Sequence, residues 1–367
     1  MAPGRKVSIS KEINAFKAPP DLPGQGGFSP RPNPAQGRER GGRTLPGAIL
    51  RPRGPKPRRV RRGTMSLYAV KKSIVNLIPG RLVRVFAAPY VSGDSLDKGL
   101  AVADRLFEER GIHTTLDVLG EAEKTEAKVR GAVENYLRAL EAVKTRGYCT
   151  LSIKPGHFGF YVSPDLCRRN VEEMAAACQA AGRGLTVDME DTDLTDFTLD
   201  LYRDLKPKYP ILGTVLQSRL HRTLDDVDRL DGLNAHVRAC IGIYNVGPDK
   251  ALTNRRQMKE NLLLLIEKLL DRGHYVCVAT HDMEYLAKAR DLLRRKAVLK
   301  DRYEFQMLLG VPRDRVQKEL VAAGETVRLY VPFASDWDDA IAYLRRRMLE
   351  SPSMSLLVLK NLFVRGH

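Results

Sequence analysis

Eight short apolar runs alternate with longer helical stretches along most of this chain, and this alternation limits the possible folds more than any other feature. Long amphipathic stretches such as Glu121–Arg146 and Asn254–Arg272 fit crossover helices. Eight such units in about 250 residues predict an α/β fold, a (β/α)8 barrel of the TIM type. The predicted strands, most of them rich in Val, Ile, Leu, Tyr or Thr as buried parallel strands are, are Thr114–Leu119, Tyr148–Lys154, Gly184–Glu190, Ile211–Gln217, His236–Gly242, His274–Thr280, Tyr303–Leu308 and Thr326–Pro332.

The first 64 residues have a different composition. Fifteen basic and three acidic residues give this segment a net charge of +12, out of +17 for the 367-residue chain. Proline, glycine and arginine crowd it, so it has too little apolar surface to offset the entropy of ordering, and we predict a disordered tail. Two other interpretations stay open: a basic arm for anionic lipid or nucleic acid, and an extension upstream of a true start at Met65. The predicted domains are therefore the tail, 1–64, and a barrel, 65–367.

The rest of the chain is close to charge balance, with the remaining 46 basic and 41 acidic residues. A nucleic-acid-binding domain is therefore not expected. The five cysteines form no CxxC pair, which argues against a disulfide scaffold or a zinc site, and no metal is expected. There is neither an 18-residue apolar run nor a secretory signal at the N-terminus. We expect a cytoplasmic protein, and peripheral attachment to the inner face of a membrane stays open.

Charged and hydrogen-bonding side chains are concentrated at the carboxyl ends of the predicted strands. Barrels of this type take their reacting groups from those ends and from the loops that follow them. Salt bridges between loops would explain a part of this concentration, but a purely structural barrel would not need all of it. The residues are Lys154, Asp188 to Asp191, Gln217, Arg238 to Tyr244, Thr280 to Asp282, Glu304 to Gln306, and Tyr330.

A helical stretch after the last predicted strand, Asp336–Glu350, carries a second candidate cluster. Tyr343, Arg346, Arg347 and Glu350 fall on one face of this helix. Two guanidiniums and a phenol on one face fit a clamp for a small carboxylate, because arginine presents paired planar donors. A solvated charge run is the alternative interpretation.

Nine blocks of the sequence resemble the proline dehydrogenase family, and they occur in the same order as in that family. A single block would be weak support, but the ordered set is specific. It runs over about 250 residues, the size of the predicted barrel. The blocks are Thr115–Glu121, Ser152–Lys154, Asp188–Asp191, Arg238–Tyr244, Ala279–His281, Glu304–Leu308, Arg328–Pro332, Tyr343–Arg347 and Leu359–Phe363.

The resemblance implies a distorted (β/α)8 barrel that holds FAD, with the last helix lying over the barrel mouth. It also implies oxidation of L-proline to 1-pyrroline-5-carboxylate by hydride transfer to FAD, with a quinone taking the electrons. Fixing the substrate carboxylate with cations would orient the ring carbon over the flavin. Alternatives that stay open are a related cyclic amino acid such as hydroxyproline, and a barrel that binds proline without turnover.

The same resemblance assigns roles to individual residues. Asp188 and Arg238 are the implied catalytic residues: Asp188 braces a cationic cluster and Arg238 hydrogen-bonds near the flavin N5. The implied substrate-binding residues are Lys154, Leu308, Tyr330, Tyr343, Arg346 and Arg347. The implied flavin-binding residues are Met189, Gln217, Arg238, Ile241, Gly242, Ile243, Thr280 and His281. For His281 taken by itself, a structural role would be the expectation.

Overall fold

A computed structural model describes residues 90–120, 122–244, 246–334, 341 and 345. The chain divides into two units, 1–62 and 63–367, and everything described belongs to the second. The predicted tail therefore lies outside the described residues, and so do Tyr343, Arg346 and Arg347 on the predicted last helix. The tail boundary and the position of the last helix stay predictions.

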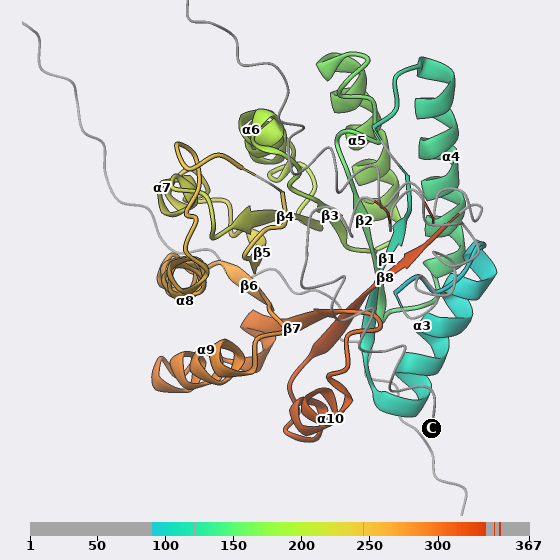
Figure 1. The fold of residues 1–367 in the computed structure, drawn as a ribbon. Helices are drawn as coiled ribbons and strands as arrows, with labels where there is room; N and C mark the ends of the chain where they lie inside the picture. The colour runs from blue at the N-terminus through green and yellow to red at the C-terminus, as the bar shows by residue number, and fades with distance from the viewer. Residues whose placement is uncertain (1–89, 121, 245, 335–340, 342–344, 346–367) are drawn as a thin grey trace, which may run out of the picture. The chain divides into compact units, whose positions relative to one another are not determined.

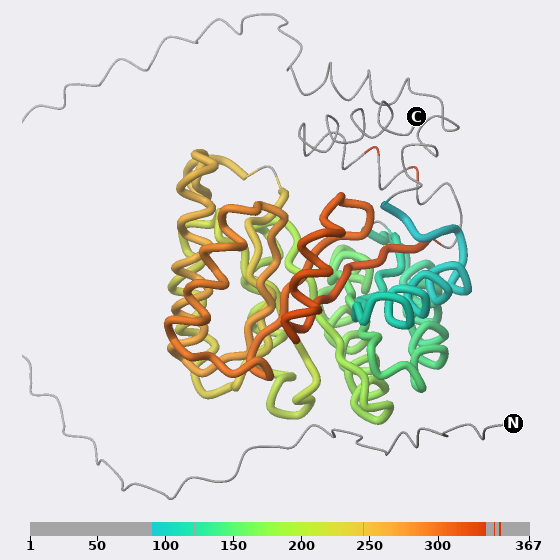
Figure 2. Tube along the Cα trace, turned by 90° about the horizontal axis from the view of Figure 1, so that it is seen from below, coloured from blue at the N-terminus to red at the C-terminus, as the bar shows by residue number. Residues whose placement is uncertain are grey.

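Eight parallel strands form a closed barrel in chain order, and helices surround it (Figure 1). Figure 2 shows the same chain as a Cα trace, turned by 90° from the view of Figure 1. The strands are β1 (His113–Val118), β2 (Cys149–Ile153), β3 (Leu185–Val187), β4 (Leu212–Gln217), β5 (His236–Cys240), β6 (Tyr275–Ala279), β7 (Tyr303–Leu308) and β8 (Val327–Phe333). The helices are α3 (Leu96–Arg110), α4 (Glu126–Val143), α5 (Pro164–Ala180), η1 (Thr192–Leu194), α6 (Thr195–Leu205), α7 (Thr223–Asp228), α8 (Arg255–Asp271), α9 (Met283–Arg295), η2 (Lys300–Arg302) and α10 (Asp314–Ala322).

Pairing of the first strand with the last closes the barrel, which confirms the predicted (β/α)8 architecture. Thr115 of β1 lies opposite Thr150 of β2 on one side and Tyr330 of β8 on the other. Each predicted strand overlaps an observed one, and β7 has the predicted bounds. The largest difference is β3, which ends at Val187 rather than at Glu190. Beyond the end of the strand, the Asp188 N–H still donates to the Ile153 carbonyl at 2.8 Å.

Residues alternate between the two faces of each strand, and this makes the inside of the barrel polar. On β5, Val237 and Ala239 have no exposed surface and belong to the hydrophobic core that the strands form with the helices. Arg238 lies between them and therefore points the other way, into the barrel. On β7, Phe305 packs into the core while Glu304 faces inward in the same manner.

Side-chain caps mark the starts of two helices that follow barrel strands. Asn254 caps α8 by accepting from the Arg256 and Gln257 N–H groups. Asp282 caps α9 in the same way. The loop from β6 into α9 is only three residues long. Within the described part of the chain, no helix combines the length and the apolar character that crossing a membrane requires.

Candidate active site inside the barrel

Asp188 is at the centre of the polar cluster inside the barrel. It follows β3 and accepts hydrogen bonds from Ser152 Oγ at 2.7 Å, Arg238 Nη1 at 2.5 Å and Tyr330 OH at 2.8 Å. These donors come from β2, β5 and β8. A single buried carboxylate therefore ties three strands together.

Arg238 is 9% exposed and is held at two of its three nitrogens. Nη1 donates to Asp188, and Nε donates to Gln306 Oε1 at 2.6 Å. The guanidinium also lies over the Tyr330 ring, 5.2 Å from its centroid, within the range of a cation–π contact. Nη2 is buried and has no hydrogen-bond partner among the described residues. Because an unmade buried hydrogen bond is costly, this nitrogen marks a position for a ligand acceptor.

Lys154 extends the cluster toward β1. Its Nζ donates to Asp117 and, at 3.5 Å, to the Tyr330 hydroxyl. Asp117 has no exposed surface and Lys154 only 8%. Lys154 and Arg238 are thus each matched by an aspartate, and Tyr330 links the two pairs.

The electrostatics of the cluster fix its protonation at neutral pH. Burial would raise the pKa of Asp188, but Arg238 and Lys154, with hydrogen bonds from Ser152 and Tyr330, hold that pKa below its usual value. Burial disfavours the charged guanidinium of Arg238, but Asp188 outweighs burial and raises the Arg238 pKa above its usual range. Burial, with Asp117 and Asp188, raises the pKa of Tyr330 well above its ordinary value. An anion, a cation and a neutral phenol therefore meet here.

A second group of predicted residues gathers where β4 and β5 end. Gln217 donates from Nε2 to the Glu190 carbonyl at 2.9 Å, while its buried Oε1 has no partner among the described residues. Gly242 has a φ of +90°, which strains any other residue, and a Cβ there would lie 2.1 Å from that Oε1 and displace it. Met189 is buried at 7% exposure. The unpaired Oε1 and the unpaired Arg238 Nη2 offer an acceptor and a donor, which suits an isoalloxazine ring with both kinds of polar atom.

Hydrogen bonds position the predicted residues that follow β6, Thr280 and His281, and the last residue of β7, Leu308. Leu308 donates its N–H to His281 Nε2 at 2.8 Å. Burial, with Arg313 nearby, lowers the pKa of His281 to about 4, so the ring is neutral. Thr280 Oγ1 accepts from the Asp282 N–H at 3.2 Å. The Asp282 carboxylate caps α9 and pairs with Lys259 at 2.5 Å, so its charge is already compensated.

Not every predicted residue joins these groups. Ile241 is half-buried and packs against the hydrophobic core, and Ile243 is 38% exposed. Neither residue contacts the Asp188 cluster through a polar atom, so their roles stay predictions.

The structure adds residues that the sequence analysis did not assign to the site. Ser152 and Asp117 complete the pairs around Asp188 and Lys154. Arg219 donates from Nη1 to the Tyr244 carbonyl and has a buried Nε with no partner in the described segments. Its side chain also lies beside Gly242. Polar residues at every second position of an apolar strand were the signal that could have identified the barrel-facing set.

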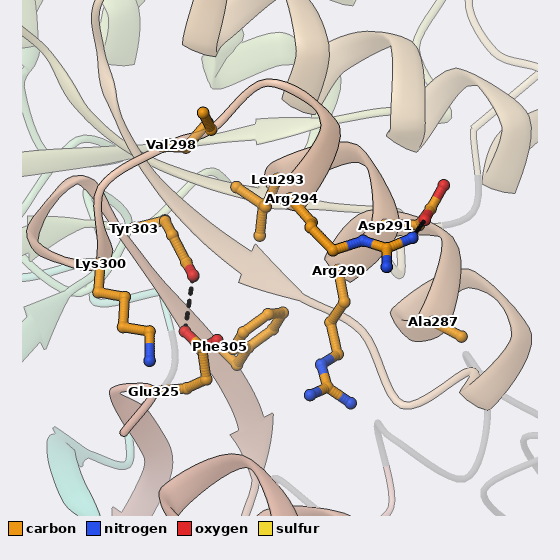
Figure 3. Close-up of a pocket in the computed structure, with 11 residues that line it drawn as sticks. Ala287, Arg290, Asp291, Leu293, Arg294, Val298, Lys300, Tyr303, Phe305 and Glu325 are labelled. Atoms are coloured by element: carbon orange, nitrogen blue, oxygen red, sulfur yellow. Dashed lines mark hydrogen bonds and ion pairs between the residues drawn. The ribbon is translucent and has the colours of Figure 1, made fainter. Parts of the chain in front are cut away.

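A pocket on the outside of the barrel is separate from this cluster. It has a volume of about 480 Å³ and lies between α9 and β7 (Figure 3). Arg290 and Arg294 of α9 line it, and the Tyr303 hydroxyl donates to Glu325 at 2.7 Å. None of the residues predicted for substrate or flavin lines this pocket. It is therefore not the site of the predicted chemistry.

Sequence comparisons show which known proteins this chain resembles. A family profile described as proline dehydrogenase matches residues 102–243 and 248–358. The chain is 31% identical over 271 residues to proline dehydrogenase 2 of Bacillus subtilis, covering 74% of this chain and 88% of that protein. It is 32% identical over 282 residues to a proline dehydrogenase of Deinococcus radiodurans, covering 75% of this chain and 89% of that protein.

Solved structures show the same fold at lower sequence identity. Proline utilization A (PutA) of Bdellovibrio bacteriovorus matches with a TM-score of 0.68 and 20% identity, over 78% of this chain and 35% of that one. PutA of Bradyrhizobium japonicum matches with a TM-score of 0.60, over 72% of this chain and 30% of that one. The chain thus spans about a third of those longer proteins. With a family profile that covers most of the barrel and curated relatives matched over nearly their full length, the chain belongs to the proline dehydrogenase family.

Proposed function

We propose that this protein is an FAD-dependent dehydrogenase that oxidises L-proline to 1-pyrroline-5-carboxylate. The observation that carries the proposal is the buried cluster of Asp188, Arg238, Tyr330 and Lys154 inside a barrel of this family. Such a cluster is costly to bury and adds little to stability, so a functional reason for it is the better explanation.

FAD, when bound, supplies the hydride acceptor, and the chain supplies position and charge. We assign the isoalloxazine ring to Arg238, Gln217 and Gly242. Arg238 Nη2 is the unpaired donor, Gln217 Oε1 is the unpaired acceptor, and Gly242 lies beside that Oε1. Arg238 would then place a fixed cation near N5, which stabilises the negative charge of a reduced flavin. Arg219, with its unpaired Nε, is a candidate partner for the diphosphate. The remaining contacts of this assignment are Met189, Ile241, Ile243, Thr280 and His281.

The substrate carboxylate needs more positive charge than the described cluster offers. Lys154 already pairs with Asp117, and Arg238 already pairs with Asp188. Because both of these cations already have an aspartate partner, we assign the substrate carboxylate to Arg346 and Arg347, with Lys154 assisting. Tyr330, Tyr343 and Leu308 would then pack against the pyrrolidine ring.

The ring nitrogen of proline must lose a proton during the reaction. Asp188 already accepts from three donors, and Tyr330 uses its own proton on Asp188. Neither group is therefore a free base, and we assign the proton to solvent. We assign the role of electron acceptor to a quinone. Because quinones of this kind lie in the membrane, this role would bring a cytoplasmic protein against its inner face.

Steady-state turnover of purified protein tests this function. We expect one non-covalent FAD per chain and turnover of L-proline with a soluble acceptor. Arg346→Met and Arg347→Met should each raise the apparent KM for proline by an amount equivalent to roughly 2–4 kcal/mol, because the carboxylate loses a charge-assisted contact. A folded protein that stays colourless after FAD is added would disprove the cofactor assignment. Unchanged proline kinetics in both variants would disprove the carboxylate clamp.

A further inference from the structure

Below the Asp188 cluster, a second set of charged residues connects to Arg238. Glu304 is the second residue of β7, so it lies near the amino end of that strand rather than at the carboxyl end where it was expected. It is 2% exposed and accepts from Arg328 Nε at 2.8 and 3.1 Å. It also accepts from Gln306 Nε2 at 2.5 Å.

We propose that Glu304 and Gln306 are positioning residues for the reaction: Glu304 fixes the direction of the Gln306 amide, and Gln306 holds the Arg238 guanidinium. This inference rests on the proposed function, in which Arg238 lies beside the flavin.

The direction of the amide follows from donor and acceptor chemistry. An ionised carboxylate only accepts hydrogen bonds, so Gln306 must turn its NH2 group toward Glu304. Its carbonyl oxygen then faces Arg238 Nε, which lies 2.6 Å away. The reversed amide would set an oxygen against the carboxylate and NH2 against the guanidinium. Glu304 therefore selects the one orientation in which Gln306 can hold Arg238.

Glu304 can serve as a fixed reference because it is anchored to the barrel wall. Arg328, its partner, also donates from Nη1 to the carbonyls of Thr114 at 2.9 Å and Tyr148 at 3.3 Å. Burial alone would raise the pKa of Glu304, but Arg328 lowers it to about 2, so the carboxylate stays ionised near neutral pH.

Two neighbours of Glu304 give this region the spacing of a metal site. A ring nitrogen of His236, Cys277 Sγ and a Glu304 oxygen all lie within 4.8 Å of one another. However, Arg328 and Gln306 already occupy the Glu304 carboxylate, and a dication would have to displace a buried guanidinium. Burial lowers the pKa of His236 to about 4, and burial with Glu304 raises the pKa of Cys277 well above its ordinary value. We therefore interpret both as neutral neighbours of Glu304.

Two anchors fix the plane of the Arg238 guanidinium more firmly than one. With Gln306 on Nε and Asp188 on Nη1, the free Nη2 has a single direction. Without Gln306, the side chain could rotate about its remaining ion pair. Charge stabilisation at a reacting atom depends on such preorganised donors.

Gln306→Met tests the inference, with Gln317→Met as the matched control. Gln317 is also a buried glutamine, 2% exposed, and it accepts from Arg110 Nη2 at 2.7 Å on the outer helix α10, away from Arg238. Both variants should lose thermal stability. Only Gln306→Met should shift the midpoint potential of the bound flavin to more negative values and slow anaerobic flavin reduction by proline at least 10-fold, with little change in KM. Glu304→Gln should shift the potential in the same direction by a smaller amount.

The outcomes separate this inference from the proposed function. Wild-type protein that binds no flavin, or whose flavin proline does not reduce, disproves the function and with it the inference. Wild-type protein that reacts while Gln306→Met keeps the wild-type potential and rate disproves the positioning role alone. Equal shifts in Gln306→Met and Gln317→Met would also disprove it. If Gln306→Met does not fold, the potential of Glu304→Gln decides the question.

Discussion

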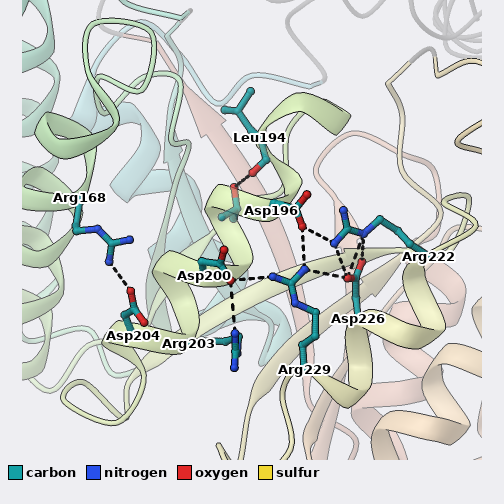
Figure 4. Close-up of polar contacts among 10 residues, drawn as sticks. Arg168, Leu194, Asp196, Asp200, Arg203, Asp204, Arg222, Asp226 and Arg229 are labelled. Carbon is teal, nitrogen blue, oxygen red and sulfur yellow. Dashed lines mark hydrogen bonds and ion pairs between the residues drawn. The ribbon is translucent and has the colours of Figure 1, made fainter. Parts of the chain in front are cut away.

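Two networks of ion pairs in this barrel use the same residue types in opposite surroundings. Inside the barrel, the paired side chains of Asp188 and Arg238 are 13% and 10% exposed. On the outside, Asp196 of α6 is 67% exposed and pairs with Arg222 at 2.6 Å and Arg229 at 2.9 Å (Figure 4). The exposed network is screened by water and salt, so its pairs are worth little each. The buried network is costly to assemble and costly to break.

This difference indicates what each network is for. The exposed pairs link α6 to the region around α7 and can be lost one at a time. In the interior, well-packed apolar side chains would often give equal or greater stability. An interior that instead keeps Lys154, Arg238 and Arg328 opposite Asp117, Asp188 and Glu304 is better explained by a need for fixed charges.

The largest effect is expected from Asp188→Asn. This change leaves Arg238 buried without its counter-charge, and breaking such a pair costs about 3–5 kcal/mol. Denaturant unfolding should show that loss, and the variant should lose flavin reduction by proline. Asp196→Asn is the matched control on the exposed network. Equal destabilisation by both changes would contradict the distinction between the two networks.

Acid should weaken the buried network with a defined sign. Glu304 has its pKa lowered from 4.5 to about 2, chiefly because Arg328 outweighs the opposing effect of burial. A carboxyl group whose pKa is lower in the folded state stabilises the protein at pH values above its unfolded-state pKa. This stabilisation is lost as the pH falls from about 4.5 toward 2. The free energy of unfolding should therefore fall over that range. Glu304→Gln should flatten the fall. A slope that is unchanged in this variant would show that Glu304 is not responsible.

Tyr330→Ser should change substrate choice more than stability. The Tyr330 hydroxyl is fixed on Asp188 and its ring lies under Arg238. If Tyr330 packs against the pyrrolidine ring as proposed, it fills space that a ring hydroxyl of the substrate would need. We expect wild type to prefer proline to hydroxyproline and the serine variant to narrow that gap. Steady-state kinetics with both amino acids measures it. Tyr303→Ser, on the outer pocket, is the control and should leave the ratio unchanged. A change of the same size in both variants would refute the assignment.

The smallest effect is expected from Asp196→Asn. The pKa of Asp196 is lowered to about 2, mainly by its hydrogen bond from Arg222. Because the carboxylate is mostly exposed, the change should cost at most about 1 kcal/mol, and less in high salt. Urea titrations at low and high ionic strength measure this. A larger loss that persists in high salt would show that the exposed network carries more weight than its surroundings suggest.

The sequence predicted the barrel well because its strands are apolar runs bounded by turn residues. Asn254–Arg272 was predicted as a helix, and α8 runs from Arg255 to Asp271 behind its Asn254 cap. Within the site, the family resemblance placed four residues in one active site. These residues are Lys154, Asp188, Arg238 and Tyr330.

The position of a side chain along the barrel axis, relative to its neighbours on other strands, could not be predicted from apolar runs. Grouping Glu304 with the carboxyl ends was wrong, because the predicted strand, Tyr303–Leu308, already places it second from the amino end. The bounds of β7 do not give the alignment of Glu304 with β6, which depends on the register between the two strands, where Cys277 lies opposite Glu304. Apolar patterning fixes which face a residue is on, but not how two polar residues on neighbouring strands are aligned. For the same reason Asp117 was not recognised as the partner of Lys154.

Anaerobic reduction of the flavin by proline tests the central claim most directly, namely that the interior network is the active site and the exterior network is scaffold. Wild type, Asp188→Asn and Asp196→Asn would each be loaded with FAD, checked for folding and mixed with L-proline without oxygen. We predict rapid bleaching of the flavin in wild type and Asp196→Asn, and little or none in folded, flavin-loaded Asp188→Asn. Bleaching of Asp188→Asn at the wild-type rate would contradict the account.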